Sequence, residues 1–333
     1  MHESFSRYVE TFSVGKSIHT LRAIRSDLQR FATWWEQRMQ QPFTPELVRD
    51  RDMTAWQIYR QVESGAKPTT INRELSSLRG YCAWAVKHGC MPTNPLADMR
   101  VLPPDPLAPR SLPILAIDML LREVGNDATN IFRQRDEALI ALLAYAGLRV
   151  QEVCDLQLRD IDLAGETITV RRGKGGKARR VPLHQSCIKT LAAYLVLRCP
   201  HGIPPIGDPA ERRAVFLGMD ITQPGQPIEN PISPQVIQRL FRRVAQQTQQ
   251  RLLADAHRTS IVTRKQNLIQ AAQSLTEASP HSLRHSLARR MLNNGATIVE
   301  VQKVLGHSRL ETTARYLMPN EDEIRDAINR SGL

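Results

Sequence analysis

The stretch Pro280–Leu317, PHSLRHSLARRMLNNGATIVEVQKVLGHSRLETTARYL, decides how the rest of the chain is interpreted. His281 and Arg284 stand three residues apart, so on a helix they face the same side. His307 closes a Leu-Gly-His turn, and Tyr316 follows nine residues later. Cationic and proton-donating groups around one phenol indicate a nucleophilic tyrosine, with a phosphodiester as the electrophile whose free oxygens need charge stabilisation.

These side chains have two other interpretations. His281 and His285, at positions i and i+4, have the spacing of a zinc pair, but no third ligand follows at the usual distance and the glutamate of an HExxH motif is absent. Tyr316 has the alternative of being a core aromatic residue. Its polar neighbours Thr313 and Arg315 favour a partly exposed position instead.

The bulk composition is that of a soluble protein with about two domains. The chain has 333 residues, of which 41% are hydrophobic and 23% charged. It contains no apolar run of about 18 residues, and its first residues lack the pattern of a secretory signal. The five cysteines form no CxxC pair, which favours reduced thiols over a disulfide frame. These features predict a cytoplasmic protein without contact to a membrane.

The charge of the chain favours an anionic partner. Its net charge is +12 and its isoelectric point is about 9.9. A globular protein this basic often binds nucleic acid, because each phosphate that it neutralises releases counterions. Solubility alone is the other explanation of such a charge. The charge by itself favours nucleic acid.

Residues 1–100 are predicted to form a helical domain. Apolar residues recur every three to four positions in Thr20–Gln40 and Thr69–His88, the period of an amphipathic helix. The proline-rich stretch 101–112 follows and is predicted to be an extended linker between two domains. The polar and basic residues expected to contact DNA from this first domain are Thr69, Thr70, Asn72, Arg73 and Arg79.

The second domain, 113–333, is predicted to start with helices over Ile114–Gly125 and Asn130–Ala146. Gly147 ends the second of these helices, and Arg149 follows two residues later, where a helix cap is its alternative role. A small antiparallel sheet is predicted from the alternating strands Glu166–Arg172 and Ala178–Leu183. The glycine-rich turn between them, GKGGK, lacks the spacing of a phosphate-binding P-loop.

The rest of this domain is predicted as a helix over Lys189–Leu197, mostly loop over Cys199–Pro234 with a short apolar piece at Ala214–Leu217, and a basic helix over Pro234–Gln250. Residues 251–279 are polar and predicted to be helical in part, with no function assigned to them. Arg239, Arg242 and Arg243 are expected to contact DNA from the basic helix.

Taken together, these motifs resemble those of the tyrosine recombinases, the phage integrase family. The resemblance spans nearly the whole chain and rests on six motifs in the family's order: KPTTINRELSSLRGYCAWA with a later NPL, GLRVQEV, RGKGGKARRVPL, PHSLRHSLA, LGH and TTARYL. The first is similar to the core-binding domain of the Xer-like branch. The resemblance implies a mainly α fold, with a helical SAM-like domain and a catalytic domain that clamp a DNA duplex.

The resemblance also implies a role for each matching residue. Tyr316 attacks the scissile phosphate and forms a 3′-phosphotyrosyl link, while Arg149 and Arg284 hold the non-bridging oxygens. Lys174 donates a proton to the departing 5′-hydroxyl, and His281 accepts the proton of the tyrosine. The residue types suit this chemistry, since forked guanidinium groups match a phosphorane and replace a metal ion. The family pattern therefore implies no metal, no ATP and no other cofactor.

Further roles are implied for residues beside the reacting groups. His307 donates a hydrogen bond to a phosphate oxygen, and Glu152 and His285 orient the site. The hairpin residues expected to contact DNA phosphates are Lys177, Arg179 and Arg180. The tail 320–333 begins with a helix-capping Asn320 and is expected to dock on a neighbouring protomer, with docking on its own domain as the alternative.

The resulting prediction is a site-specific recombinase that exchanges strands between two short inverted-repeat DNA sites as a homotetramer, alone or with a second recombinase or accessory protein. It is compatible with dimer resolution, cointegrate resolution, cassette capture and integration alike. The sequence leaves three alternatives open: a type IB topoisomerase, a DNA-binding relative without catalysis, and a transcription factor that reads a palindrome.

Overall fold

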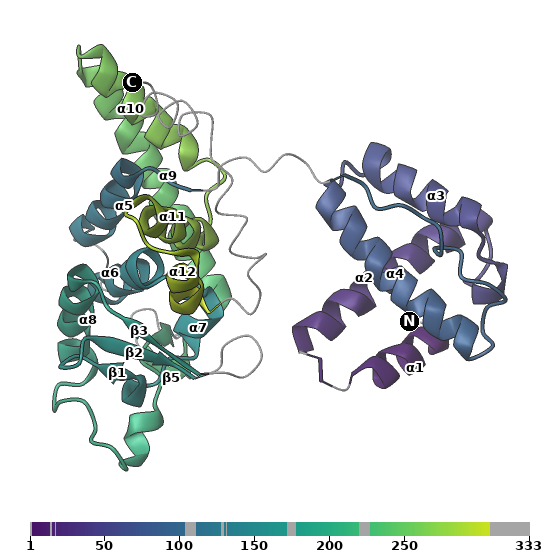
Figure 1. Cartoon of the computed structure of the whole chain (residues 1–333), viewed down its shortest axis with the longest axis horizontal. Coiled ribbons are helices and arrows are strands. Elements are labelled where there is room, and N and C mark those ends of the chain that lie inside the picture. Colours follow the sequence, from purple (N-terminus) through teal and green to yellow (C-terminus); the bar gives the residue numbers. More distant parts are fainter. Residues whose placement is uncertain are drawn as a thin grey trace. The chain divides into compact units, whose positions relative to one another are not determined.

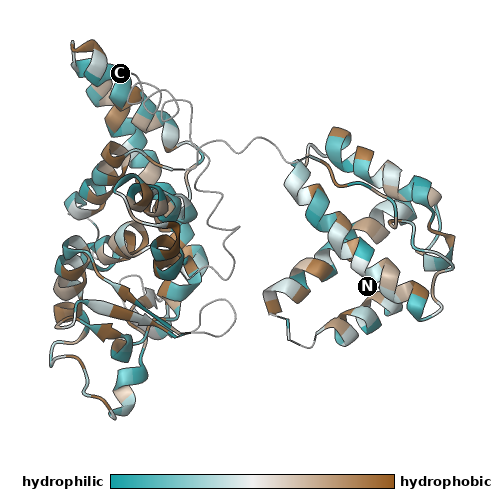
Figure 2. Ribbon diagram, in the orientation of Figure 1, coloured by the Kyte–Doolittle hydropathy of each residue, from teal (hydrophilic) through white to brown (hydrophobic). Residues whose placement is uncertain are grey.

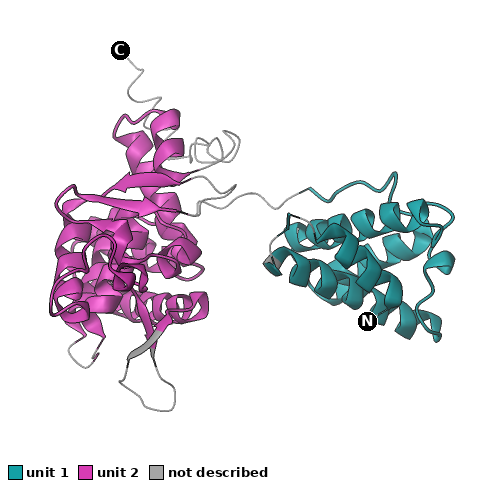
Figure 3. Ribbon diagram, turned by 90° about the horizontal axis from the view of Figure 1, so that it is seen from below, with its two compact units in different colours: residues 1–108 teal, residues 109–333 magenta. Residues whose placement is uncertain are grey.

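The chain forms two compact units, Met1–Ala108 and Pro109–Leu333 (Figures 1 and 3). The computed structural model describes residues 2–13, 15–16, 18–103, 111–127, 130, 132–171, 178–219 and 227–306. Both units are mainly helical, and the strands within these residues lie in the larger unit. This confirms the predicted fold class of a mainly α protein with a small antiparallel sheet. Over the same residues, no helix has the length and apolar character needed to cross a membrane.

The smaller unit is built from helices alone. Its elements are α1 (Glu3–Phe12), α2 (Ile18–Met39), a short 3-10 turn (Pro45–Leu47), α3 (Asp50–Ile58) with a π-helical extension (Tyr59–Glu63), and α4 (Pro68–Lys87). Helices α2 and α4 correspond to the two that periodicity predicts. Helices α1 and α3 are too short to show more than about two turns of the pattern, so the sequence did not reveal them.

The core of the smaller unit is aromatic. Phe31, Trp35, Trp56 and Tyr81 are almost fully buried there, and the ring of Phe31 meets that of Trp56 edge to face at 5.6 Å. Burying such side chains stabilises the unit by roughly 1.5–3 kcal/mol each. All four tryptophans of the chain belong to this unit, which makes tryptophan fluorescence a probe of the smaller unit alone.

Helix α4 also buries a carboxylate. Glu74 is fully buried and accepts hydrogen bonds from Arg30 Nη1 at 2.5 Å and from Arg60 Nε and Nη2 at 2.8 and 3.0 Å. A buried charge requires such partners, since leaving it unpaired is costly. The residue that marks the helix start in the sequence therefore organises two arginines in the structure.

On each side of the proline-rich segment, side chains of the adjoining unit hold the nearest described residues by hydrogen bonds. The Asn72 side chain donates to the carbonyl of Leu102 and accepts from its N–H, both at 2.8 Å. Arg79 donates to the carbonyls of Leu96 and Met99. In the larger unit, the N–H of Leu112 donates to Ser286 Oγ at 2.7 Å.

The larger unit packs its helices around a buried apolar segment. The helices are α5 (Ile114–Asn126), α6 (Arg133–Ala141) with a π-helical continuation (Leu142–Ala146), α7 (Val150–Cys154), α8 (Gln185–Arg198), α9 (Pro234–Arg258), α10 (Val262–Ser274), α11 (Pro280–Asn293) and α12 (Ile298–Leu305). Short 3-10 turns occur at Leu158–Asp160 and Pro209–Arg212. The polar region 251–279 thus forms the end of α9 and the whole of α10.

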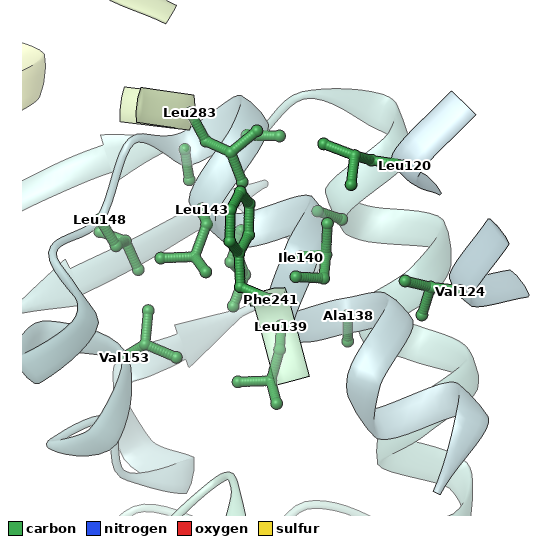
Figure 4. Packing of buried hydrophobic residues seen from close by; sticks show 14 of the residues in the cluster. Leu120, Val124, Ala138, Leu139, Ile140, Leu143, Leu148, Val153, Phe241 and Leu283 are labelled. Atoms are coloured by element: carbon green, nitrogen blue, oxygen red, sulfur yellow. The ribbon is translucent and has the colours of Figure 1, made fainter. Parts of the chain in front are cut away.

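The core of this unit surrounds α6 and its continuation. Every residue from Ala138 to Ala144 is fully buried. Phe241 of α9 and Leu283 of α11 close over Ile140 and Leu143 (Figure 4), and the hydrophobic colours of Figure 2 gather on the same central helices. The segment ends at Gly147, whose φ of +62° lies in the left-handed region that favours glycine.

The main sheet has the order β1-β2-β3, with β1 (Ile161–Asp162), β2 (Thr167–Val170) and β3 (Arg179–Pro182) all antiparallel. Strands β2 and β3 lie within the predicted hairpin, and its turn lies outside the described residues. A second ribbon pairs β4 (Leu217–Met219) with β5 (Pro227–Pro231). The sequence predicted mostly loop there, with a short apolar piece at Ala214–Leu217. Strand β4 has only three residues, and β5 begins and ends with proline, so neither shows a clear strand pattern.

Candidate active site

Helix α11 carries three of the predicted site residues. It begins at Pro280, and proline suits the first helical position because its missing N–H would have no helical partner there. His281 and His285 lie one turn apart, with their rings edge to face and the centroids 4.5 Å apart. Over the described part of the chain, no three His, Cys, Asp or Glu side chains gather into a possible metal site.

Arg149 and Glu152 form a pair at the start of α7. Arg149 precedes the helix with extended backbone, and its N–H donates to Glu152 Oε2 at 2.8 Å. Its Nη1 donates to Glu152 Oε1 at 2.7 Å. The backbone of Arg149 thus serves the helix start, and its guanidinium pairs with a buried carboxylate.

Arg179 of β3 completes the surroundings of Glu152. Its Nη1 and Nη2 donate to Glu152 Oε1 and Oε2 at 2.9 and 2.8 Å, a two-pronged geometry that strengthens a charged pair. The side chain of Arg179 is only 11% exposed. The sequence interpretation placed it among the DNA contacts, whereas here it lies between the sheet and α7.

The carboxyl group of Glu152 has a strongly lowered pKa. Burial alone would raise this pKa, but the hydrogen bonds from Arg179 and from the backbone of Arg149, with the charges of both arginines, lower it from 4.5 to about 2. Glu152 is therefore an anion throughout the physiological pH range. It is the negative centre of an arginine cluster.

Arg284 is the third arginine of this cluster, with only 1% of its surface exposed. Its Nη1 donates to the carbonyl of Gly147 and its Nη2 to the carbonyl of Leu305. Nη1 also lies 4.0 Å from Glu152 Oε2. A residue of α11 is thereby attached to the end of the buried helix, to α7 and to α12.

The C-terminal end of α12 rests on all three arginines. Arg179 Nε donates to the carbonyl of Val304 at 3.1 Å, Arg284 Nη2 to that of Leu305, and Arg149 Nη2 to that of Gly306 at 3.3 Å. The last carbonyls of a helix have no partner within it and form the negative end of its dipole. The three guanidinium groups therefore supply the hydrogen-bond donors that these carbonyls lack and the positive charge that stabilises this end of the helix dipole.

Two glycines allow these close approaches. Gly306 has a φ of +63°, and a Cβ there would lie 2.9 Å from Cδ, Nε and Nη1 of Arg179. Gly147 has a φ of +62°, and a Cβ there would lie 2.7 Å from Leu287 and 2.8 Å from Leu305. Both positions therefore need glycine for backbone conformation and for space.

We expect Gly306→Ala to destabilise the larger unit by about 2 kcal/mol, because left-handed backbone costs a residue with a Cβ roughly 1–2 kcal/mol and Arg179 must also shift. Circular dichroism during urea unfolding would measure the loss. Gly295→Ala is the matched control, since Gly295 also has a positive φ of 88° but open space around its Cβ position. Equal losses for both variants would contradict a role of the Arg179 contact.

The structure places Arg149, Glu152 and Arg284 in one cluster, with His281 and His285 on the helix that carries Arg284. Lys174, His307 and Tyr316 lie outside the described residues, as does Lys177. Gly306, the last described residue, directly precedes His307 in the chain.

The residues expected to contact DNA fall into two groups. Asn72 and Arg79 hold residues 96–102, as described above, and Arg73 pairs with Asp27. Thr70 is half-buried. The exposed members are Thr69, Arg73, Arg180, Arg239, Arg242 and Arg243. All of the expected DNA contacts remain predictions.

The position of Arg179 was missed, although a signal for it exists. Side chains alternate across a strand, so Arg179 and Val181 share one face of β3 while Arg180 faces the other way. Val181 is fully buried and Arg180 is exposed. The alternation in ARRVPL therefore places the first arginine of the pair inward and the second outward.

Comparison with known proteins identifies the class. Residues 119–323 match the model of the phage integrase family, and residues 5–89 match that of the phage integrase N-terminal SAM-like domain. Tyrosine recombinase XerC of Neisseria meningitidis is 31% identical over 96% of this chain and 92% of its own length. The chain therefore belongs to the phage integrase family and is a tyrosine recombinase, a site-specific enzyme that exchanges DNA strands.

Solved structures support the fold. The Tn1549 transposon integrase, in complex with a circular intermediate DNA, matches with a TM-score of 0.66 at 21% identity over 98% of this chain and 99% of that one. Lambda integrase bound to a core site matches with a TM-score of 0.60 at 16% identity over 95% and 94%. The family match decides against the topoisomerase and transcription-factor alternatives.

Proposed function

We propose that this recombinase cuts DNA through Tyr316, which forms a 3′-phosphotyrosyl bond while Arg149 and Arg284 bind the non-bridging oxygens of the scissile phosphate. The observation that carries this proposal is the arginine cluster around Glu152. Three guanidinium groups surround one carboxylate, which leaves an excess of two positive charges. That excess suits a pentacoordinate phosphorane, whose added negative charge develops during attack.

The proton transfers are assigned to three other residues. His281 accepts the proton of the tyrosine, Lys174 donates a proton to the departing 5′-hydroxyl, and His307 donates a hydrogen bond to a phosphate oxygen. Glu152 and His285 orient these groups. Glu152 is buried, and each of its two carboxylate oxygens accepts a hydrogen bond from Arg179, which supports its assignment as an orienting residue. The bond energy kept in the phosphotyrosine allows rejoining without ATP.

The assembly that we propose is a homotetramer on two short inverted-repeat sites, acting in the cytoplasm, with a second recombinase or accessory protein joining where the site requires it. The net charge of +12 supports binding of the DNA backbone. The tail 320–333, with its one-sided apolar residues Ile324 and Ile328, would dock on the neighbouring protomer.

Covalent trapping tests the chemistry. Full-length protein is mixed with nicked duplexes from a random library and from DNA flanking the gene, then denatured, and the DNA attached to protein is sequenced. Wild type should yield adducts enriched in an inverted-repeat site, and Tyr316→Phe should yield none while still binding. Tyr59→Phe makes the same chemical change at a half-buried ring of the smaller unit and should retain adducts. Adducts from Tyr316→Phe, or none from wild type despite specific binding, would refute the proposal.

A further inference from the structure

Arg179 differs from the other basic residues of the β2–β3 hairpin that the structure describes. Each of its three guanidinium nitrogens has an acceptor inside the protein: Nη1 and Nη2 the two oxygens of Glu152, and Nε the carbonyl of Val304. Its neighbour Arg180 is 66% exposed and donates to Thr167 Oγ1 at 2.9 Å on the outer face. The partly buried Arg179 thus faces the cluster, and the exposed Arg180 faces solvent.

Arg179 is also where three separate elements meet. Glu152 belongs to α7, Val304 to α12, and Arg179 itself to β3, which is paired to β2 by the register Val170↔Arg179. A planar fork with fixed donor directions can hold two partners at once, whereas a flexible ammonium group acts as a single point charge. The side chain therefore fixes the distance between the carboxylate and the end of α12.

We propose that Arg179 is a positioning residue for strand cleavage: it holds Glu152 and the C-terminal end of α12 so that Arg149 and Arg284 present their guanidinium groups to the scissile phosphate. This inference rests on the function proposed above for Arg149 and Arg284. Arg179 itself does not contact DNA.

The geometry explains why the two phosphate-binding arginines depend on a third. Glu152 Oε1 accepts from both Arg149 and Arg179, and Oε2 lies 2.8 Å from Arg179 and 4.0 Å from Arg284. Without Arg179, Oε2 loses its side-chain donor and attracts Arg284, and the carbonyl of Val304 loses its partner. The end of α12, from which the chain continues to His307, is then no longer held on the β3 side.

The charge balance leads to the same result. Glu152 neutralises one guanidinium group, and with Arg179 present two positive charges remain for the phosphate. Removing Arg179 leaves Arg149 and Arg284 to share the carboxylate, so only one positive charge remains. The loss affects the transition state more than DNA binding, which draws on many basic residues.

The test uses full-length Arg179→Ala and Arg179→Lys on the nicked site recovered by covalent trapping. We expect the single-turnover rate of adduct formation at saturating protein to fall about 100-fold, the effect of a small misplacement of catalytic groups. The dissociation constant for DNA and its salt dependence should stay close to those of the wild type. Arg258→Ala, which removes an arginine that is 81% exposed at the end of α9, is the control for the loss of one positive charge.

The pH dependence of stability provides a readout specific to the Glu152 contact. Among the described residues, the charged groups around Glu152 are Arg149, Arg179 and Arg284, and the hydrogen bond from Arg179 is the largest of the effects that lower the pKa of Glu152. In Arg179→Ala this pKa rises, so the part of the unfolding free energy that is lost between about pH 4.5 and pH 3 should become smaller than in wild type. Arg179→Lys should restore part of this pH dependence, without restoring the full cleavage rate.

Two results would overturn the inference. One is cleavage at the wild-type rate under saturation together with weaker binding and a salt slope reduced by about one, which is the behaviour of a direct phosphate contact. The other is a lowered rate while the pH dependence of the unfolding free energy stays as in wild type. If Arg179→Ala does not fold, Gly306→Ala displaces the same side chain instead. It must then lower the rate of adduct formation while leaving the dissociation constant for DNA close to that of the wild type. Absence of adducts from wild type would instead refute the function of Tyr316.

Discussion

Replacing Arg284 with alanine should reduce adduct formation by a factor of about 1,000 and destabilise the larger unit by about 3 kcal/mol. The catalytic loss is expected because removing one preorganised donor to a developing oxyanion costs about 10²–10³ in rate, and Arg284 also orders its neighbours. The stability loss follows from burial. Arg284 is 1% exposed and donates to the carbonyls of Gly147 and Leu305. In Arg284→Ala both carbonyls lose this hydrogen-bond donor.

The stability loss is measured separately in each unit. Circular dichroism during urea unfolding follows both units, while tryptophan fluorescence follows only the smaller one, which holds every tryptophan. The fluorescence transition should remain at its wild-type midpoint. Arg284→Lys keeps the charge but cannot reach both carbonyls with a single ammonium group, so it should recover part of the stability and little of the rate. A stable Arg284→Ala protein with unaltered cleavage would contradict both roles.

Glu152→Gln should destabilise the larger unit by about 3 kcal/mol at pH 7. The difference in unfolding free energy between wild type and this variant should become smaller at acid pH. The substitution preserves shape and removes the charge that three arginines surround. The pKa of Glu152 falls from 4.5 to about 2 on folding, and each pKa unit corresponds to about 1.4 kcal/mol. Because the folded-state pKa is lowered, this stabilisation is complete above about pH 4.5 and disappears as the pH falls towards 2.

Unfolding of wild type and Glu152→Gln is therefore compared by circular dichroism at several values between pH 7 and pH 3. The two proteins should approach each other in stability as the pH falls. Glu123→Gln is the matched control, since Glu123 pairs with the half-exposed Arg251 at 3.1 Å. An ion pair of that kind contributes about 1 kcal/mol or less. A difference between wild type and Glu152→Gln that stays constant with pH would show that the charge is not the cause.

Much of the site could be predicted from sequence because its residues belong to local patterns. His281, Arg284 and His285 share one helix whose start is marked by Ser279 and Pro280, and Arg149 and Glu152 lie three residues apart at the start of α7. What spacing alone could not show is the meeting of these elements. The contacts of Arg179 with α7 and of Arg284 with α12 join segments 27 and 21 residues apart, and tertiary packing decides them.

The DNA contacts assigned to the smaller unit remain predictions, and two of these side chains have partners within the protein that the sequence did not indicate. A polar side chain on a helix can face solvent or can bind the backbone of another segment, and sequence periodicity treats both as hydrophilic. Asn72 and Arg79 bind the chain at residues 96–102. The same limit applies to Glu74, which has the appearance of a helix-start residue and is fully buried with two arginines.

The two side chains that hold the chain at Leu102 and Leu112 define a tether. Only residues 103–111 separate these two attachment points, and the ten Cα–Cα steps from Leu102 to Leu112 can span at most about 35 Å. In the DNA complex proposed above, two units joined by so short a connection would behave as a bivalent ligand, in which binding of the first raises the effective concentration of the second to the millimolar range. Asn72 and Ser286 would then influence the avidity of the chain for DNA by fixing the length of this connection.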